Sequence, residues 1–223
     1  MGQDIIIIGG GVIGCTTAFF LTRAGLRVTL LEKGALAQGT TGNSFGWANA
    51  STKTENEAYH RLNVAGMAGY RALAAEFGAE RLGIHQTGAL HVVGRSDAAG
   101  FRAMEKDFAA LQRFGYPSEW LESGRLQEET RGLELPADAA AILLPADMVI
   151  DAPRVARALA RTARLGGADI RENCAALALI ADDEGTVQGI ETAEGLITAP
   201  TSLLAAGSAP VLTVAAPTPF GVC

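Results

Sequence analysis

The sequence has 223 residues, of which 48% are hydrophobic and 19% are charged. This composition excludes a disordered or collagen-like chain and is typical of a globular protein whose strands are buried on both faces. Asp and Glu outnumber Lys and Arg by 24 to 18, a net charge of -6, so we expect no nucleic-acid partner. No run of about 18 apolar residues occurs, so the sequence predicts no transmembrane segment.

The three cysteines, Cys15, Cys174 and Cys223, are far apart and lack the spacing of a metal site. Such a sparse, odd set is typical of reduced thiols in a cytoplasmic protein rather than of a disulfide framework. We therefore expect a cytoplasmic protein with no metal site. At the start of a predicted helix, Cys15 has two interpretations: a small packed residue, which we favour, or a thiol with a lowered pKa.

The first 32 residues predict a βαβ unit. Residues 4–8 form a β-branched run that is typical of a strand buried in a parallel sheet. After three glycines, residues 12–24 predict a helix that ends before Gly25, and residues 27–31 predict a second strand. The crossover between these two strands should be right-handed.

The turn between the first strand and the helix carries the motif Gly9-x-Gly11-x-x-Gly14, and Glu32 ends the second strand. Glycines in this pattern form a tight turn, let the backbone approach a pyrophosphate and let the helix pack on the strand, while the helix N-terminus favours phosphates. An acidic residue at the position of Glu32 hydrogen-bonds ribose hydroxyls. The sequence therefore predicts a dinucleotide site, with a glycine turn that only packs as the alternative.

Residues 33–54 follow neither a helical nor a strand period and are rich in Gly, Thr, Asn and Ser, so we expect a functional loop. Beyond it, apolar spacing predicts helices and strands in alternation, at residues 59–77, 88–93, 101–111 and 139–144. A further helix begins at Asp151, which caps it, with Pro153 in its first turn. Its arginines share a face that we expect to be solvated rather than a phosphate site: Arg154, Arg157, Arg161 and Arg164.

Short strands follow and predict a small antiparallel meander, at residues 169–172, 177–181, 186–192, 196–198 and 201–205. Residues 203–207 are expected to form a buried strand whose small final residues let a ligand approach the backbone. After Glu32 the chain leaves the parallel sheet for about 135 residues and returns only at residues 169–172, whereas an NAD-binding domain usually continues its βαβα alternation. This difference favours FAD over NAD.

Four stretches of the sequence match a known family in the same order along the chain: residues 4–33, 38–47, 149–170 and 205–207. Together they resemble the FAD-dependent D-amino acid oxidase superfamily, in the branch with glycine oxidase, sarcosine oxidase and D-amino acid dehydrogenases. The resemblance implies an α/β fold with a Rossmann-like FAD-binding domain, which has a mixed sheet and a β-meander, plus part of an α+β substrate domain. It assigns residues 1–47 and 147–216 to the FAD-binding domain and residues 48–146 to the partial substrate domain.

The resemblance also implies roles for individual residues. The implied FAD-binding residues are Gly9, Gly11, Val12, Ile13, Gly14, Glu32, Lys33, Gly39, Thr40, Thr41, Ala176, Ala206 and Gly207. Gly46 and Trp47 match positions beside the flavin ring, although a core position is the alternative for Trp47. No acid–base residue is assigned, because hydride transfer to the cofactor requires mainly binding and orientation from the protein.

The implied reaction is oxidation of an amino acid or N-alkyl amino acid by hydride transfer to FAD. The alternatives are an NAD(P)-linked dehydrogenase, a flavin-dependent 2-hydroxyacid dehydrogenase, and a non-catalytic dinucleotide-binding subunit. Members of the family are longer, and their C-terminal portion completes the substrate domain. We therefore expect a second polypeptide to complete the fold in a hetero-oligomer, from a split gene or a processed precursor, with truncation as the alternative.

Overall fold

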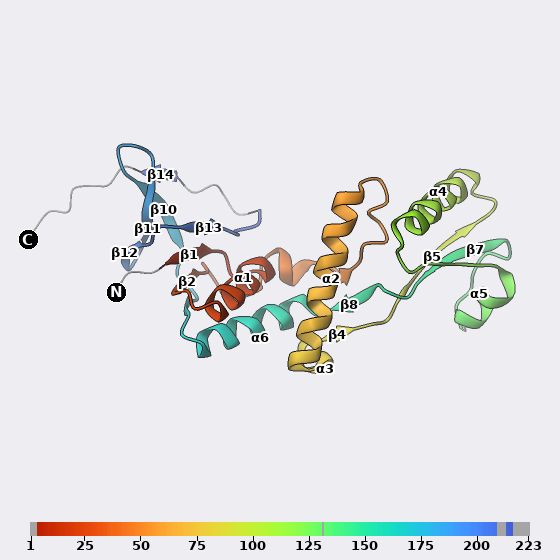
Figure 1. The fold of residues 1–223 in the computed structure, drawn as a ribbon, viewed down its shortest axis with the longest axis horizontal. Coiled ribbons are helices and arrows are strands. Elements are labelled where there is room, and N and C mark those ends of the chain that lie inside the picture. The colour runs from red at the N-terminus through yellow and green to blue at the C-terminus, as the bar shows by residue number, and fades with distance from the viewer. Residues whose placement is uncertain (1–3, 131, 209–212, 216–223) are drawn as a thin grey trace, which may run out of the picture. The chain divides into compact units, whose positions relative to one another are not determined.

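The structure, a computed structural model, describes residues 4–130, 132–208 and 213–215. The chain divides into two compact units, and Figure 1 labels most of their elements. The first unit comprises Met1–Phe45 and Asp151–Cys223, and the second comprises Gly46–Ile150. Among the described residues, no helix is long and apolar enough to cross a membrane.

The described residues of the first unit form two α-helices, one short 3-10 helix and two four-stranded sheets. Its helices are α1 (Val12–Arg23), η1 (Thr40–Asn43) and α6 (Ala152–Leu165). Its strands are β1 (Ile5–Ile8), β2 (Val28–Leu31), β9 (Asp169–Arg171), β10 (Ala176–Ala181), β11 (Val187–Thr192), β12 (Gly195–Thr198), β13 (Ser202–Leu204) and β14 (Thr213–Ala215).

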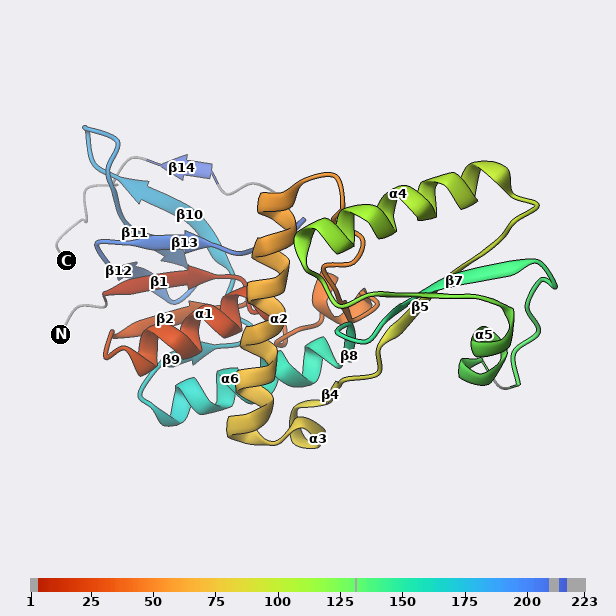
Figure 2. The ribbon, with the colours of Figure 1, turned by 45° about the vertical axis from the view of Figure 1, so that its right-hand side comes forward.

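A parallel sheet with the order β13-β1-β2-β9 forms the centre of this unit, and Figure 2 shows these strands side by side. Ile7 pairs with Leu30 of β2 on one side and with Leu203 of β13 on the other. The β1–α1–β2 segment is the βαβ unit that the sequence predicts. Gly25 follows α1 with φ of 90°, as expected for a glycine just beyond a helix end.

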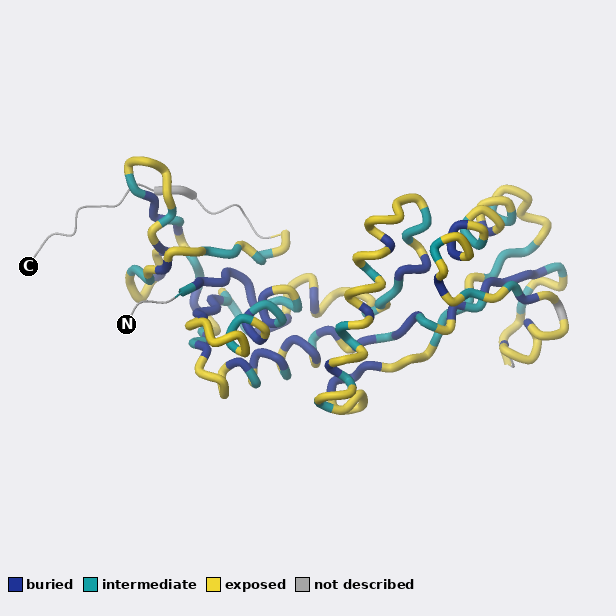
Figure 3. The backbone as a smooth tube through the Cα atoms, viewed as in Figure 1, coloured by how far each residue is buried: buried dark blue, intermediate teal, exposed yellow. Residues whose placement is uncertain are grey.

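Strand β1 is buried on both faces because each face packs against a different layer. Ile6 and Ile8 belong to a core cluster with Ile190 of the second sheet, whereas Ile7 faces α1 at Gly14. Alternate side chains of a strand point to opposite faces, so a continuous isoleucine run satisfies both layers. Figure 3 shows this strand as a buried segment of the tube.

The predicted meander is only partly correct. β10, β11 and β12 form antiparallel pairs, but β13 pairs in parallel with β1. β9 pairs in parallel with β2, which confirms the expected return of the chain to the parallel sheet at residues 169–172. The expectation of a buried strand at residues 203–207 is also wrong in part, because Leu204 is 58% exposed. β13 ends the row of strands, so its side chains are covered less well than those of β1.

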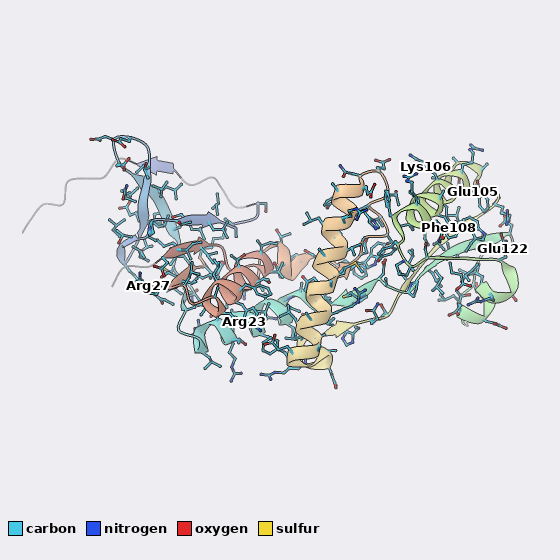
Figure 4. The ribbon with its side chains drawn as sticks, in the orientation of Figure 1. Arg23, Arg27, Glu105, Lys106, Phe108 and Glu122 are labelled. Atoms are coloured by element: carbon cyan, nitrogen blue, oxygen red, sulfur yellow. The ribbon has the colours of Figure 1, made fainter. Side chains whose placement is uncertain are left out.

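Helix α6 packs against α1 through a buried stripe that includes Val155, Leu159 and Ala163. The Asp151 carboxylate caps α6 by accepting a hydrogen bond from the Arg154 backbone N–H at 2.9 Å. All four arginines of this helix are exposed, which confirms the expected solvated face. An ion pair joins the N-terminal ends of β1 and β2. Arg27, labelled in Figure 4, directly precedes β2 and pairs at 2.6 Å with Asp4, which directly precedes β1.

The second unit contains two three-stranded antiparallel sheets, β3-β8-β4 and β5-β7-β6. Its strands are β3 (Trp47–Ala48), β4 (Ile84–His85), β5 (Ala89–Gly94), β6 (Glu119–Leu121), β7 (Ala139–Leu144) and β8 (Met148–Ile150). Its helices are α2 (Glu57–Phe77), α3 (Ala79–Leu82), α4 (Ala98–Phe114) and α5 (Ser123–Glu129). The Asp97 carboxylate accepts a hydrogen bond from the Gly100 N–H at 3.0 Å, as predicted for the cap of α4.

Residues 33–54, predicted as a loop without repeating structure, contain η1 and β3. Both elements are too short to produce a periodic pattern of apolar residues, so the sequence gives no sign of them. The border between the two units falls inside this stretch, between Phe45 and Gly46.

Candidate functional site

The glycine turn after β1 requires Gly9 for two reasons. Its φ is +110°, which side chains other than glycine rarely adopt, and an added Cβ would lie 2.4 Å from the carbonyl oxygen of Ala205. Its backbone N–H donates to the carbonyl of Leu31 at 2.8 Å. Gly9 therefore brings the ends of β1, β2 and the segment after β13 to one place.

Gly14 and Gly11 keep the rest of the turn free of side chains. A Cβ on Gly14 would lie 1.9 Å from the Gly9 carbonyl oxygen, so α1 could not approach β1 as closely as it does. A Cβ on Gly11 would lie 3.0 Å from Oγ1 of Thr41. The result is bare backbone at the N-terminus of a 12-residue helix with no acidic residue in its first turn. Such a helix end favours a bound anion.

The Thr41 hydroxyl closes the turn from the side of η1. Its Oγ1 accepts a hydrogen bond from the Val12 backbone N–H at 2.9 Å, and the residue is only 9% exposed. A threonine hydroxyl has one proton to donate besides its acceptor lone pairs, so this bond leaves the proton available for an oxygen of a ligand. Thr40 lies beside the end of β13, because a Cβ on Gly207 would be 3.6 Å from its Oγ1.

Glu32, directly after β2, accepts hydrogen bonds through both carboxylate oxygens, one from the glycine turn and one from its own loop. Oε2 accepts from the Gly10 N–H at 2.7 Å, and Oε1 accepts from the Gly34 N–H at 2.9 Å. Each oxygen retains a further lone pair for a hydroxyl group. The sequence reasoning did not assign a role to Gly10, although the run of three glycines is a signal for it. A Cβ there would lie 2.9 Å from the Glu32 Cβ.

The remaining predicted cofactor residues of the first unit differ in their exposure. Ile13 is 65% exposed at the start of α1, and Lys33 and Gly39 are exposed in the segment between β2 and η1. Ala176 and Ala206 are half-buried and pack against the core cluster of Ile6 and Ile8. The structure therefore gathers the glycine turn, Glu32, the two threonines and the end of β13 around one helix terminus.

Gly46 and Trp47 belong to the second unit. The backbone carbonyl of Gly46 accepts from the Ile150 N–H at 2.7 Å, and a Cβ on Gly46 would lie 1.9 Å from the Ile150 carbonyl oxygen. Trp47 is 37% exposed, so it is not a core residue. Its Nε1 donates to the Asp147 carboxylate at 3.0 Å. The sequence reasoning missed Asp147, because no local pattern marks a residue whose partner lies 100 positions away.

Cys15 is a packed residue, as favoured, and the alternative of a lowered pKa is wrong. It is fully buried, and its thiol donates to the Gly10 carbonyl at 3.3 Å. Burial raises its pKa to about 12, and the negative charges of Glu32 and Glu172 act in the same direction. Burial outweighs the helix N-terminus because a thiolate would lose its hydration. Cys15 therefore supports the turn and is not a nucleophile.

A cavity of about 410 Å³ lies elsewhere on the first unit, beside the exposed face of α6. It is lined by Leu36, Arg157, Arg161, Arg164, Leu165 and Glu172. Arg164 there donates to the Ile170 carbonyl at 2.8 Å and lies 3.7 Å from the Glu172 carboxylate. None of the predicted cofactor residues lines this cavity.

A comparison with protein families decides between the cofactors that the glycine motif allows. Residues 4–219 match the model of a family described as FAD dependent oxidoreductase. The chain belongs to this family. The cofactor of the family is FAD, which favours FAD over the NAD(P) alternative for the glycine turn.

Individual relatives lie within the same group of enzymes. Glycine oxidase from Geobacillus kaustophilus is 29% identical over 210 residues, which are 92% of this chain and 54% of that protein. The 4-methylaminobutanoate oxidase (formaldehyde-forming) of Paenarthrobacter nicotinovorans is 30% identical over 203 residues, 91% of this chain and 24% of that protein. The crystal structure of the Geobacillus glycine oxidase matches with a TM-score of 0.81 at 27% identity, covering 92% of this chain and 55% of the other. The chain thus spans about half the length of glycine oxidase.

The residues around the glycine turn suit FAD. The turn presents glycine backbone, and the first turn of α1 contains no acidic residue, which favours a bound diphosphate. Thr41 adds a buried hydroxyl that can donate, and Glu32 adds acceptor oxygens suited to ribose hydroxyls. The donors and acceptors of this region therefore match the parts of a dinucleotide in kind.

Proposed function

We propose that this chain is the FAD-binding half of a flavin-dependent oxidoreductase that oxidises an amino acid or an N-alkyl amino acid. The family match and the glycine turn carry the proposal. The names of two relatives support the substrate class, because glycine is an amino acid and 4-methylaminobutanoate is an N-methyl amino acid. The alternative substrate class is a 2-hydroxy acid.

We assign residues 1–47 and 147–216 to the FAD-binding domain and residues 48–146 to part of the substrate domain. The two compact units support this assignment, since their borders lie within a few residues of these positions. In the FAD-binding domain, the amides at the start of α1 and the Thr41 hydroxyl would bind the diphosphate, and Glu32 would bind the ribose of the adenosine. Lys33 and Ala176 would lie near the adenosine, with Thr40, Ala206 and Gly207 near the diphosphate and ribityl chain, while Gly46 and Trp47 would lie beside the flavin ring.

When bound, FAD supplies the acceptor for the hydride that leaves the substrate α-carbon. The work of this chain is to bind and orient the reactants, because correct placement converts a bimolecular encounter into a unimolecular step. Gly9, Gly11 and Gly14 keep the site open, and Thr41 and Glu32 fix the position of the turn. We assign no general acid or base to this chain.

We propose that a further segment, absent from this sequence, completes the fold; a second polypeptide in a hetero-oligomer is one source of it, and a longer form of the same chain is the other. The comparison in length supports this, because the chain matches about half of glycine oxidase. The edge position of β13 and its exposed Leu204 are consistent with further packing there. We also propose a cytoplasmic location, which the free buried thiols of Cys15 and Cys174 support.

The test is to purify the chain with whatever polypeptide accompanies it and to record its visible spectrum. The proposal predicts a flavin spectrum that bleaches under anaerobic conditions when an amino acid or N-methyl amino acid is added. If 2-hydroxy acids bleach the flavin and amino acids do not, the substrates are 2-hydroxy acids instead. A protein that retains no flavin, or a flavin that no amine reduces, would contradict the proposed function. Recovery of the chain alone as an active monomer would contradict the second polypeptide.

A further inference from the structure

A buried carboxylate in the second unit holds three neutral donors from two segments, residues 47–51 and Tyr116. Asp147 is fully buried, and its Oδ2 accepts from Trp47 Nε1 at 3.0 Å and from the Ser51 hydroxyl at 2.7 Å. Its Oδ1 accepts from the Tyr116 hydroxyl at 2.5 Å. Burying a charged group is costly unless hydrogen bonds compensate for the lost water. The three donors supply that compensation.

The geometry of the sheet explains why Asp147 can contact the indole. Trp47 pairs with Val149 across the β3–β8 ladder, and Asp147 is two residues before Val149. Asp147 directly precedes β8, so it lies diagonally from Trp47 across the ladder, a separation that an aromatic side chain can span. The backbone of Asp147 is itself anchored, since its carbonyl accepts from the Gly88 N–H at 3.0 Å.

The second carboxylate oxygen of Asp147, Oδ1, is held by Tyr116. Tyr116 follows the end of α4 and is buried, and its ring packs edge-on against His60 at a centroid distance of 5.2 Å. Burial raises the pKa of the Tyr116 hydroxyl well above its usual range, and its bond to Asp147 adds to this effect. The hydroxyl therefore remains a donor at neutral pH. Arg71, whose charge acts to lower the pKa of Tyr116, is exposed and donates to the Ala146 carbonyl at 2.9 Å.

Trp47 differs from the other two donors because a large part of it faces outward. Its side chain is 37% exposed, whereas Ser51 and Tyr116 are each 5% exposed. An exposed aromatic ring ordinarily samples several rotamers, but a bond from Nε1 to a rigid buried anion restricts the ring to one orientation. The arrangement thus presents one face of an indole in a fixed position at a surface.

We propose that Asp147 is a positioning residue that locks the indole of Trp47 in the orientation needed at the flavin ring. The role at the flavin rests on the proposed function, while the lock itself rests on the contacts of this unit. If Asp147 only held segments of the unit in place, loss of its bond to Ser51 or Tyr116 would have the same effect as loss of its bond to Trp47. The positioning role predicts instead that loss of the Trp47 bond has an effect that loss of the other two bonds does not reproduce.

The chain offers an internal control, because it contains two tryptophans. Trp120 Nε1 also donates to a carboxylate, that of Glu122, at 2.7 Å, but Glu122, labelled in Figure 4, is exposed. We would measure hydrogen exchange of the two indole N–H groups by ¹⁵N NMR on the full chain, with its partner where one co-purifies. A bond to a charged buried group predicts that Trp47 exchanges about tenfold more slowly than Trp120, or slower still. Equal rates in the unsubstituted protein would overturn the lock, whether or not any variant folds.

The decisive variant is Asp147→Asn, compared with Ser51→Ala and Tyr116→Phe. The lock predicts that D147N speeds exchange at Trp47 by about tenfold, and that S51A and Y116F change it less than about threefold. In the flavin-loaded protein, D147N should also shift the flavin absorption bands while S51A and Y116F do not. A shift of equal size in all three variants, or an unchanged Trp47 signal in D147N, would overturn the proposal. Absence of flavin from the unsubstituted protein would contradict the proposed function, and the exchange rates would still decide the lock.

Discussion

The hydroxyl of Thr41 accepts a hydrogen bond from the backbone N–H of Val12 at 2.9 Å, although 29 positions separate the two residues. The donor is an N–H of the first turn of α1, which has no partner within the helix. A side chain from η1 therefore caps the helix that the glycine turn introduces. Its remaining proton adds to the partial positive charge of the helix terminus.

Replacement of Thr41 tests this contact. Thr41→Val keeps the shape but leaves the Val12 N–H without its acceptor, which should cost about 1–3 kcal/mol of stability and weaken FAD binding at least about tenfold. Thr41→Ser keeps the hydroxyl and should restore most of both. Urea unfolding and an FAD titration of each variant provide the measurements. Equal FAD affinity for T41V and T41S would show that the hydroxyl does not contact the ligand.

The second test replaces Gly14, where an added Cβ would lie 1.9 Å from the Gly9 carbonyl oxygen. Gly14→Ala should destabilise the protein by about 1–3 kcal/mol or more, because the neighbouring atom belongs to backbone that cannot move aside easily. The matched control is Gly69→Ala in α2, where a Cβ meets nothing within 4 Å. That change should stabilise by about 0.5–1 kcal/mol. Thermal unfolding followed by circular dichroism measures both, and similar effects of the two changes would contradict the close approach of α1 to β1.

Glu32 provides the third test. Its two oxygens accept from Gly10 and Gly34, and a glutamine offers only one acceptor oxygen, so Glu32→Gln would turn an amide N–H toward a backbone N–H. We expect a loss of about 1–3 kcal/mol in stability and about tenfold or more in FAD affinity.

Glu172→Gln is the control for that change, because Glu172 also accepts from a backbone N–H, that of Leu36 at 3.0 Å. This variant should lower stability and leave FAD affinity unchanged. An equal loss of FAD affinity in E32Q and E172Q would mean that the effect comes from stability and not from contact with the adenosine.

The raised pKa of Cys15 predicts a loss of stability at alkaline pH. The thiol ionises near pH 9 in the unfolded chain and near pH 12 in the folded one, so between these values the unfolded state binds fewer protons and stability falls as pH rises. The stability that the neutral Cys15 thiol provides is fully present below about pH 9, and about 4 kcal/mol of it is lost by pH 12. Unfolding of the unsubstituted protein and of Cys15→Ala at several alkaline pH values measures it.

Those two unfolding curves should converge as pH rises, because the alanine variant has no thiol at this position to ionise. Tyr116, whose pKa is also raised, contributes a slope of the same sign to both proteins and cancels in the comparison. A constant difference in unfolding free energy from pH 8 to 11 would contradict the raised pKa of Cys15.

The sequence allowed the nucleotide-binding half of the fold to be predicted because its signals are local. The isoleucine run of β1, the glycine turn and the helix cap at Asp151 each arise from neighbouring residues. The family resemblance added FAD, which the glycine turn alone does not distinguish from NAD.

The contacts that hold the site in place were not predictable in the same way. The Thr41–Val12 bond joins residues that are remote in the chain, and Asp147 collects partners 31 to 100 positions away. The sheet to which β13 belongs was also hidden, since this short strand looks like part of the meander until its pairing is known. Such features depend on tertiary pairing and leave no periodic pattern.

The most direct test of the account is an equilibrium titration of FAD into the protein stripped of cofactor, with its partner polypeptide present where one co-purifies. The account predicts saturable binding of one FAD per chain, weakened about tenfold or more by T41V and unchanged by G69A. It also predicts no comparable binding of NAD or NADP. Failure to bind FAD, or binding that is equally strong in T41V, would contradict the assignment of the turn after β1 as the flavin nucleotide site.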